Sequence, residues 1–209
     1  MKKGYILGIL FFSGLWGISE AKLGGLLYSA GMYNYASVPM TVIALVILTL
    51  ARMYLPQLGT ATLIAACAMS YKFLNTPFFA CHFLGILLTG ICYDLFFGVF
   101  RIKSRAISAV ATVYLSYALF AVLITYVFRY DPWVQGGLSK VLRHIGVGGS
   151  LTAVACAVFV PLAFCLGERL KAGLASPFDL RIQWAPGSIS LITAGLWIFG
   201  LAAFIPQIF

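Results

Sequence analysis

Ionisable side chains inside apolar segments are the residues of this sequence best suited to chemistry. Glu20 lies near the end of the first apolar stretch, Lys72 closes the third, and His82 and Asp94 lie within the fourth. A charged group at bilayer depth is costly unless it is paired or hydrated, so such residues are functional by default. Glu20, Lys72 and His82 fall near the same membrane boundary, where they predict charged contacts to a small polar ligand.

Aromatic residues accompany this group of charges. Trp16 precedes Glu20 by one helical turn, and Tyr33-Asn34-Tyr35 follow the first apolar stretch. Flat rings with hydrogen-bonding tips suit a ring-containing ligand. Two other interpretations stay open: interfacial tyrosines are ordinary membrane-belt residues, and Glu20 and Lys72 can form a structural ion pair. The expected substrate-binding residues are Trp16, Glu20, Tyr33, Asn34, Tyr35, Lys72 and His82.

Asp94 predicts a second feature, at the opposite boundary. Gly90 and Gly98 flank it at spacings of four, which leaves gaps for a neighbouring helix. Asp94 either pairs with Arg101 or Arg105 at the helix end, or acts with Arg101 as a gate or coupling residue. The related face formed by Ala61, Ala65, Ala68 and Lys72 suits a helix that lines a cavity, or a lysine that extends to the interface.

The remaining reactive residues do not predict catalysis. No second histidine stands at zinc-ligand spacing from His82, since His144 follows the fifth segment. The five cysteines lie in apolar segments without a CxxC pair and are interpreted as small core residues. We expect no metal, no cofactor and no enzymatic activity; an intramembrane enzyme using Asp94 or His82 is the weakest alternative.

Composition determines the elements that must position these residues. The chain is 62% hydrophobic and 9% charged, with a mean hydropathy of +1.01. Soluble domains are about 45–50% apolar and about 25% charged, so lipid must be the solvent here. The sequence predicts an all-α polytopic membrane bundle of six to seven transmembrane helices, forming a single transmembrane domain over residues 1–209. It has no P-loop or dinucleotide fingerprint, so a partner must hydrolyse any ATP used.

Seven apolar runs are separated by charges, prolines and glycines. A spanning helix needs about 20 residues, so the short third run, Thr60–Tyr71, is expected to be re-entrant, tilted or shielded. Ser139–His144 is expected to form a short interfacial helix. If Ser19-Glu20-Ala21 is a signal-peptide cleavage site, the first run is lost and six remain.

The basic residues predict orientation. The net charge is +9, but the basic residues are scattered between apolar runs, which fits lipid headgroups better than nucleic acid. With the N-terminus inside, inner loops carry nine Lys and Arg and outer loops five. The inner set is Lys2, Lys3, Arg52, Arg101, Lys103, Arg105, Arg169, Lys171 and Arg181.

Small residues recur every four positions in the first run: Ser13, Gly17, Ala21, Gly25 and Ser29. Such a stripe lets two membrane helices approach closely, either within the chain or with a partner subunit.

With this stripe, six or so helices in about 200 residues and the inner basic bias, the chain resembles the substrate-binding (S) component of energy-coupling-factor transporters. The resemblance implies that Ser13, Gly17, Ala21 and Gly25 dock onto a membrane coupling subunit linked to ATPase subunits. It also implies that Tyr33-Asn34-Tyr35 cap a vitamin-like ligand. The expected function is uptake of a small nutrient across a bacterial cytoplasmic membrane. The alternative is a non-catalytic structural or assembly subunit of a larger membrane complex.

Overall fold

The computed structural model is all-helical, with no strand among the residues it describes, 3–32, 36–75, 80–173 and 186–202. Three segments, named η, are π-helical continuations of α-helices. The elements in chain order are α1 (Lys3–Ser29), α2 (Ser37–Tyr54), α3 (Thr60–Asn75), α4 (Ala80–Tyr93), η1 (Asp94–Val99), α5 (Arg105–Val122), η2 (Leu123–Val127), α6 (Asp131–Arg143), η3 (His144–Gly149), α7 (Ser150–Gly173) and α8 (Pro186–Ala202).

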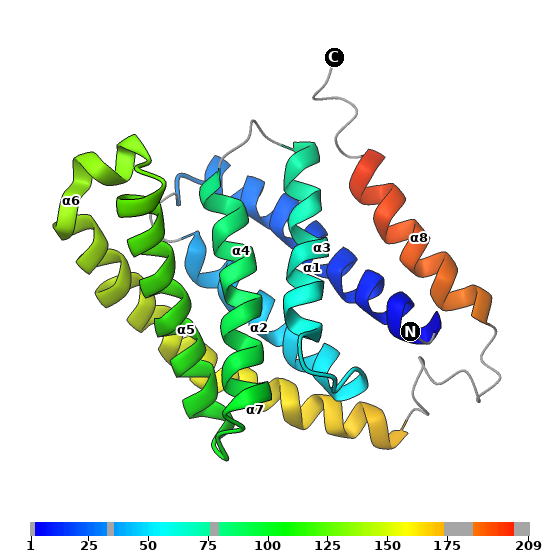
Figure 1. The fold of residues 1–209 in the computed structure, drawn as a ribbon. Helices are drawn as coiled ribbons and strands as arrows, with labels where there is room; N and C mark the ends of the chain where they lie inside the picture. Colours follow the sequence, from blue (N-terminus) through cyan, green and yellow to red (C-terminus); the bar gives the residue numbers. More distant parts are fainter. Residues whose placement is uncertain (1–2, 33–35, 76–79, 174–185, 203–209) are drawn as a thin grey trace.

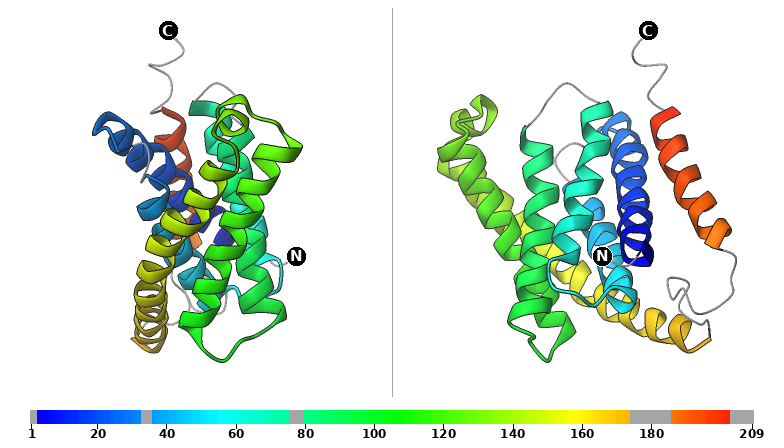
Figure 2. Two further views of the ribbon diagram at one scale, coloured as in Figure 1. Left: turned by 90° about the vertical axis from the view of Figure 1, so that its left-hand side faces the viewer. Right: turned by 45° about the vertical axis from the view of Figure 1, so that its right-hand side comes forward.

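Successive long helices run in alternate directions between two ends of a bundle (Figure 1). One end holds the starts of α1, α3 and α5 and the ends of α2, η1 and α7; we call it the Arg101 end. The other holds the ends of α1, α3 and η2 and the starts of α2 and α4; we call it the Arg129 end. Figure 2 shows α1 between α3 and α8, with α8 at the edge of the bundle.

Local sequence explains where several helices start and stop. Ser104 caps α5, because its side chain accepts a hydrogen bond from the Ile107 amide at 3.3 Å. Pro56 follows the end of α2, and Gly59, at φ 84°, makes the turn into α3. Gly137, at φ 55°, kinks α6. The predicted interfacial helix Ser139–His144 is therefore part of a longer, bent helix.

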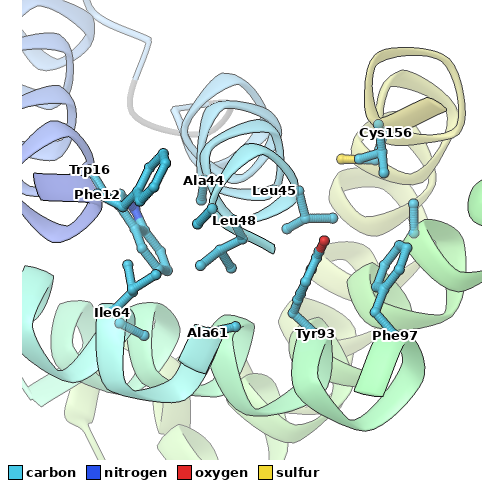
Figure 3. Packing of buried hydrophobic residues seen from close by; sticks show 14 of the residues in the cluster. Phe12, Trp16, Ala44, Leu45, Leu48, Ala61, Ile64, Tyr93, Phe97 and Cys156 are labelled. Atoms are coloured by element: carbon cyan, nitrogen blue, oxygen red, sulfur yellow. The ribbon is translucent and has the colours of Figure 1, made fainter. Parts of the chain in front are cut away.

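The core consists of one cluster that joins six helices. Phe12 and Trp16 of α1 meet Ile64 of α3, while Tyr93 and Phe97 lie between α2 and α7 (Figure 3). The Tyr93 and Phe97 rings stack at 4.3 Å between centroids. The buried residues of this cluster are Ile9, Phe12, Trp16, Ala44, Leu45, Leu48, Ala51, Leu55, Ala61, Ile64, Ala65, Ala68, Ile86, Tyr93, Phe97, Ala109, Val113, Tyr117, Ala153, Cys156, Val160 and Phe164.

The all-α class and the apolar length of the helices agree with the sequence. Four helical stretches are long and apolar enough to cross a membrane: Gly4–Gly24, Ser37–Tyr54, Arg105–Val127 and Asp131–Ala172. Three shorter apolar helices accompany them within the described residues: Thr60–Ser70, Phe83–Val99 and Ile189–Gly200. The third run is helical as α3, which starts at Thr60 as predicted and extends past Tyr71 to Asn75.

Candidate functional site

Trp16 and Glu20 form a local pair on α1. Trp16 is 1% exposed, and its indole Nε1 donates a hydrogen bond to Glu20 Oε1 at 3.2 Å. The spacing of four residues places both side chains on one helix face. Glu20 lies inside the apolar stretch Gly4–Gly24, and an indole from the preceding turn holds its carboxylate there.

Glu20 and Lys72 lie on α1 and α3, two helices that pack against each other. Both helices start at the Arg101 end, where the hydroxyls of Tyr5 and Thr60 share a hydrogen bond of 2.9 Å. α1 is inclined to α3 (Figure 1), and Trp16 of α1 meets Ile64 of α3 (Figure 3). Lys72 therefore lies closer to the Arg129 end than Glu20 does, by about one helical turn or more.

His82 of α4 lies at the level of Lys72 of α3. α4 runs antiparallel to α3, and Asp94 of η1 is hydrogen-bonded to Thr62 of α3. Counting back from this bond, His82 lies about 18 Å from Asp94 and Lys72 about 15 Å from Thr62. The backbone thus brings Lys72 and His82 to one level near the Arg129 end, with Glu20 on the neighbouring helix α1. The side chains of Lys72 and His82 are outside the description, as are residues Tyr33, Asn34 and Tyr35 altogether.

The small face of α3 packs against α4. Ala61, Ala65 and Ala68 are buried, and a Cβ added to Gly90 would lie 2.5 Å from Ala65 Cβ and 2.8 Å from the Ala61 carbonyl oxygen. The expectation that this face lines a cavity is therefore wrong over Ala61 and Ala65. The expectation that Gly90 admits a neighbouring helix is confirmed.

Asp94 is tied to the start of α3. Its Oδ2 accepts hydrogen bonds from the backbone amide and the hydroxyl of Thr62, both at 2.8 Å. The carboxylate is buried, and its Oδ1 has no hydrogen-bond partner among the described residues. Because the first amides of a helix have no partner within it, this carboxylate caps α3 from a neighbouring helix.

The basic residues expected to pair with Asp94 have other partners. Arg101 Nε donates to the Gly98 carbonyl at 3.2 Å, and Arg105 forms an ion pair of 2.6 Å with Glu168 of α7. Arg52 Nη2 donates to the Phe97 carbonyl at 2.6 Å. The interpretation of Asp94 as a partner of Arg101 or Arg105 is therefore wrong, because the Asp94 carboxylate binds the Thr62 amide of α3 instead of a guanidinium.

The small-residue stripe of α1 is partly inside the bundle. Ser13 and Gly17 are buried, whereas Ala21 is half-buried and Ser29 is exposed; the surroundings of Gly25 lie outside the description. The neighbouring Gly14 faces α8, since an added Cβ would lie 3.3 Å from Trp197 Nε1. Internal packing thus accounts for Ser13 and Gly17.

A cluster that sequence reasoning missed lies at the Arg129 end. The His144 ring stacks on Tyr117 at 4.6 Å between centroids. It forms a T-shaped contact with the Trp133 ring at 5.1 Å between centroids. The Tyr117 hydroxyl bonds Thr152 at 2.9 Å and Thr41 at 3.4 Å, which joins α5 to α7 and α2. The amphipathic pattern of residues 131–143 could have predicted part of this cluster, because it places Trp133 on the helix face that meets the bundle.

The remaining candidate chemistry is sparse. Among the described residues, no three His, Cys, Asp or Glu side chains group as a metal site, and Cys67, Cys92, Cys156 and Cys165 are free thiols. No protein-family model, curated protein or solved structure matches the chain. The arrangement therefore defines a class only: an all-helical bundle of apolar helices, three of which carry the ionisable positions Glu20, Lys72 and His82.

Proposed function

We propose that this chain is an integral membrane component that binds a small nutrient for uptake. Four long apolar helices and three shorter ones alternate in direction between the two ends of the bundle. Seven crossings are the simplest membrane arrangement of such a chain, since apolar helices satisfy their backbone hydrogen bonds internally. The short α3 is tolerated because α1, α2 and α4 surround it.

The basic residues support an N-terminus on the inner side. Arg52, Arg101, Lys103 and Arg105 belong to the Arg101 end, as does Lys171, whose Nζ donates to the Met53 carbonyl at 3.3 Å. Lys and Arg are enriched in inner loops of membrane proteins. We assign the Arg101 end to the inner face of a bacterial cytoplasmic membrane and the Arg129 end to the outer face.

The observation that carries the proposal is the Trp16–Glu20 hydrogen bond on α1, a helix that packs against α3, which in turn packs against α4. A carboxylate on α1, an ammonium on α3 and an imidazole on α4 suit a ligand that has both donors and acceptors. Trp16 fixes the Glu20 side chain through its indole and adds an apolar wall. We therefore assign Trp16, Glu20, Tyr33, Asn34, Tyr35, Lys72 and His82 to a vitamin-like ligand that enters from the outer face.

Energy for uptake is assigned to partner subunits. A membrane coupling subunit would contact the accessible part of the stripe, which begins at the half-buried Ala21, rather than the buried Ser13 and Gly17. ATPase subunits would act at the inner face, the side to which η1 and Arg101 belong. Asp94 then couples a movement of α3 to one of η1, because it belongs to η1 and accepts two hydrogen bonds from Thr62 of α3.

The test is native mass spectrometry of the protein purified in mild detergent, followed by thermal-shift binding against a panel of water-soluble vitamins. We expect one small molecule to be retained and to stabilise the protein. Glu20→Gln and Lys72→Gln should each weaken its binding by about tenfold or more, the loss expected when one charge-assisted hydrogen bond is removed. Arg143→Gln, an exposed change at the same end, is the matched control. Unchanged affinity in the Glu20 and Lys72 variants would reject the site.

The second candidate is a structural or assembly subunit without a ligand. The burial of Ser13 and Gly17 favours it, because the stripe already serves packing within this chain. It predicts that large subunits co-purify in stoichiometric amounts and that no vitamin shifts the unfolding temperature. The same mass spectrum therefore separates the two functions.

A further inference from the structure

Two helix ends at opposite faces of the bundle have the same sequence and the same backbone form. α4 and η1 end in Val99-Phe100-Arg101, and α5 and η2 end in Val127-Phe128-Arg129. In each, the phenylalanine amide donates to the carbonyl five residues earlier, Leu95 or Leu123, at 2.9 Å. In each, the arginine then adopts a left-handed conformation, with φ of 48° at Arg101 and 47° at Arg129.

Arginine is a costly choice at these two positions. A left-handed backbone brings Cβ too close to the following carbonyl oxygen in any residue with a side chain, so helices usually end this way on glycine. Arg101 and Arg129 are the two non-glycine residues with positive φ in the described part of the chain. A turn alone would be more stable with glycine, which indicates that the guanidinium itself is needed at both ends.

The side chains around both turns face outward. Val99, Phe100, Val127 and Phe128 are each more than half exposed. Arg101 uses Nε for the Gly98 carbonyl, and Arg129 makes no hydrogen bond or ion pair within the described residues. Each turn thus presents two apolar side chains beside a guanidinium with free donors.

The spacing of the two turns matches a bilayer. The stretch Arg105–Val127, which joins them, has 23 residues and is about 34 Å long at 1.5 Å per residue. The hydrocarbon core of a bilayer is about 30 Å thick. Aromatic residues concentrate at the boundary of that core, and arginine binds phosphate through a planar fork of donors.

We propose that the two Val-Phe-Arg turns are paired lipid anchors, one in each leaflet. Val99 and Phe100, like Val127 and Phe128, insert at the edge of the acyl chains, and Arg101 and Arg129 each bind the headgroup phosphate of a phospholipid. The pair fixes the height of α5 in the membrane and with it the depth of the helices packed on α5. This inference rests on the membrane location proposed above, but not on the nutrient-binding function.

The test measures how much phospholipid stabilises the purified full chain. Thermal unfolding is followed in mild detergent with and without added phosphatidylglycerol for the wild type, Arg101→Gly, Arg129→Gly and the double variant. Without lipid, the glycine variants should unfold at the same or a higher temperature, because the strained backbone is relieved. With lipid, the rise in midpoint should shrink in each single variant and nearly vanish in the double variant.

Three controls make the result decisive. Lys103→Gln removes a nearby exposed cation from an unstrained position and should keep the full lipid response. Arg101→Lys should keep only part of it, because lysine has the charge without the fork. Inorganic phosphate alone should not stabilise the wild type; an equal shift with it would overturn the lipid assignment. A full lipid response in the double glycine variant would overturn the anchors.

Experiments on the same preparations distinguish a failure of the lipid anchors from a failure of the proposed membrane location or function. If the double variant resists extraction from membranes by alkali and still responds fully to lipid, the anchors fail while the membrane location stands. If the wild type itself is released by alkali, the membrane location fails. Vitamin binding should be unchanged in Arg101→Gly, because Arg101 lies at the opposite end of the bundle from Lys72 and His82.

Discussion

Asp94 and Thr62, on antiparallel neighbouring helices, are joined by two hydrogen bonds of 2.8 Å to a single carboxylate oxygen. Thr62 lies in the first turn of α3, where backbone amides have no acceptor within the helix. A residue of η1 therefore completes the start of α3. Any movement that separates η1 from α3 must break this contact.

Asp94→Ala should destabilise the protein by about 1–3 kcal/mol, because the half-buried amide and hydroxyl of Thr62 lose their acceptor. Asp94→Asn keeps an acceptor oxygen for Thr62 and should cost less. Thermal unfolding in detergent compares the two variants. Equal midpoints for wild type and Asp94→Ala would show that the contact contributes nothing to stability.

The same pair of variants separates stability from coupling. If Asp94 only caps α3, Asp94→Asn should retain both its fold and its uptake activity in cells. If the carboxylate charge is needed for coupling, Asp94→Asn should fold and bind ligand but lose uptake. Thr62→Ser, which keeps the amide and the hydroxyl, should resemble the wild type in both assays.

Gly90→Ala should be strongly destabilising, because the new Cβ would lie 2.5 Å from Ala65 Cβ and 2.8 Å from a backbone oxygen. Forcing a methyl group into a filled core costs about 1–3 kcal/mol. Gly85→Ala in the same helix is the matched control, since its nearest neighbour would be 3.8 Å away at Phe120. Similar midpoints for the two variants would contradict the close packing of α3 with α4.

Gly17→Leu should unfold the chain rather than release a partner, because Gly17 is buried within the bundle. Ala21→Leu, at the half-buried part of the same stripe, should keep the fold and weaken the docking of a membrane partner. Size-exclusion profiles report the fold, and co-purification from native membranes reports the partner. A well-folded Gly17→Leu protein would show that this face is more open than the packing indicates.

Glu168→Gln should change the free energy of unfolding by less than about 1 kcal/mol, because exposed ion pairs contribute little. The side chains of Arg105 and Glu168 are 44% and 51% exposed. Arg105→Gln should cost more than Glu168→Gln, since the guanidinium also lies 4.5 Å from the centre of the Phe164 ring. The reverse order of the two unfolding midpoints would contradict the contribution of the Arg105–Phe164 contact.

Features that depend on one helix or on composition could be predicted from the sequence. The apolar composition gave the all-α class, and the spacing of Gly90 from Asp94 correctly marked a place where a neighbouring helix enters. The start of the third run at Thr60 matched α3, but the helix extends beyond Tyr71 to Asn75.

Features that depend on which helices are neighbours could not be predicted. Arg101 and Arg105 are close to Asp94 in sequence, but the amide of Thr62 is closer in space because α3 packs on α4. The alanine face of α3 is equally compatible with a cavity wall and with a packing surface. The close approach of Gly90 to Ala65 shows that it is a packing surface. Trp133 and His144 meet because Gly137 bends α6, and a bend at one glycine has no clear signature in the sequence.

The Trp16–Glu20 hydrogen bond has a consequence for how the protein is made. In the membrane location proposed above, α1 and α3 cross in the same direction, so all of α2 has to be inserted before they can meet. During that interval, Glu20 would enter the membrane before α3 is present. Its partner Trp16 comes from the preceding turn of the same helix. The first helix therefore brings its own hydrogen-bond donor for the carboxylate, and insertion of Glu20 does not have to wait for the rest of the chain.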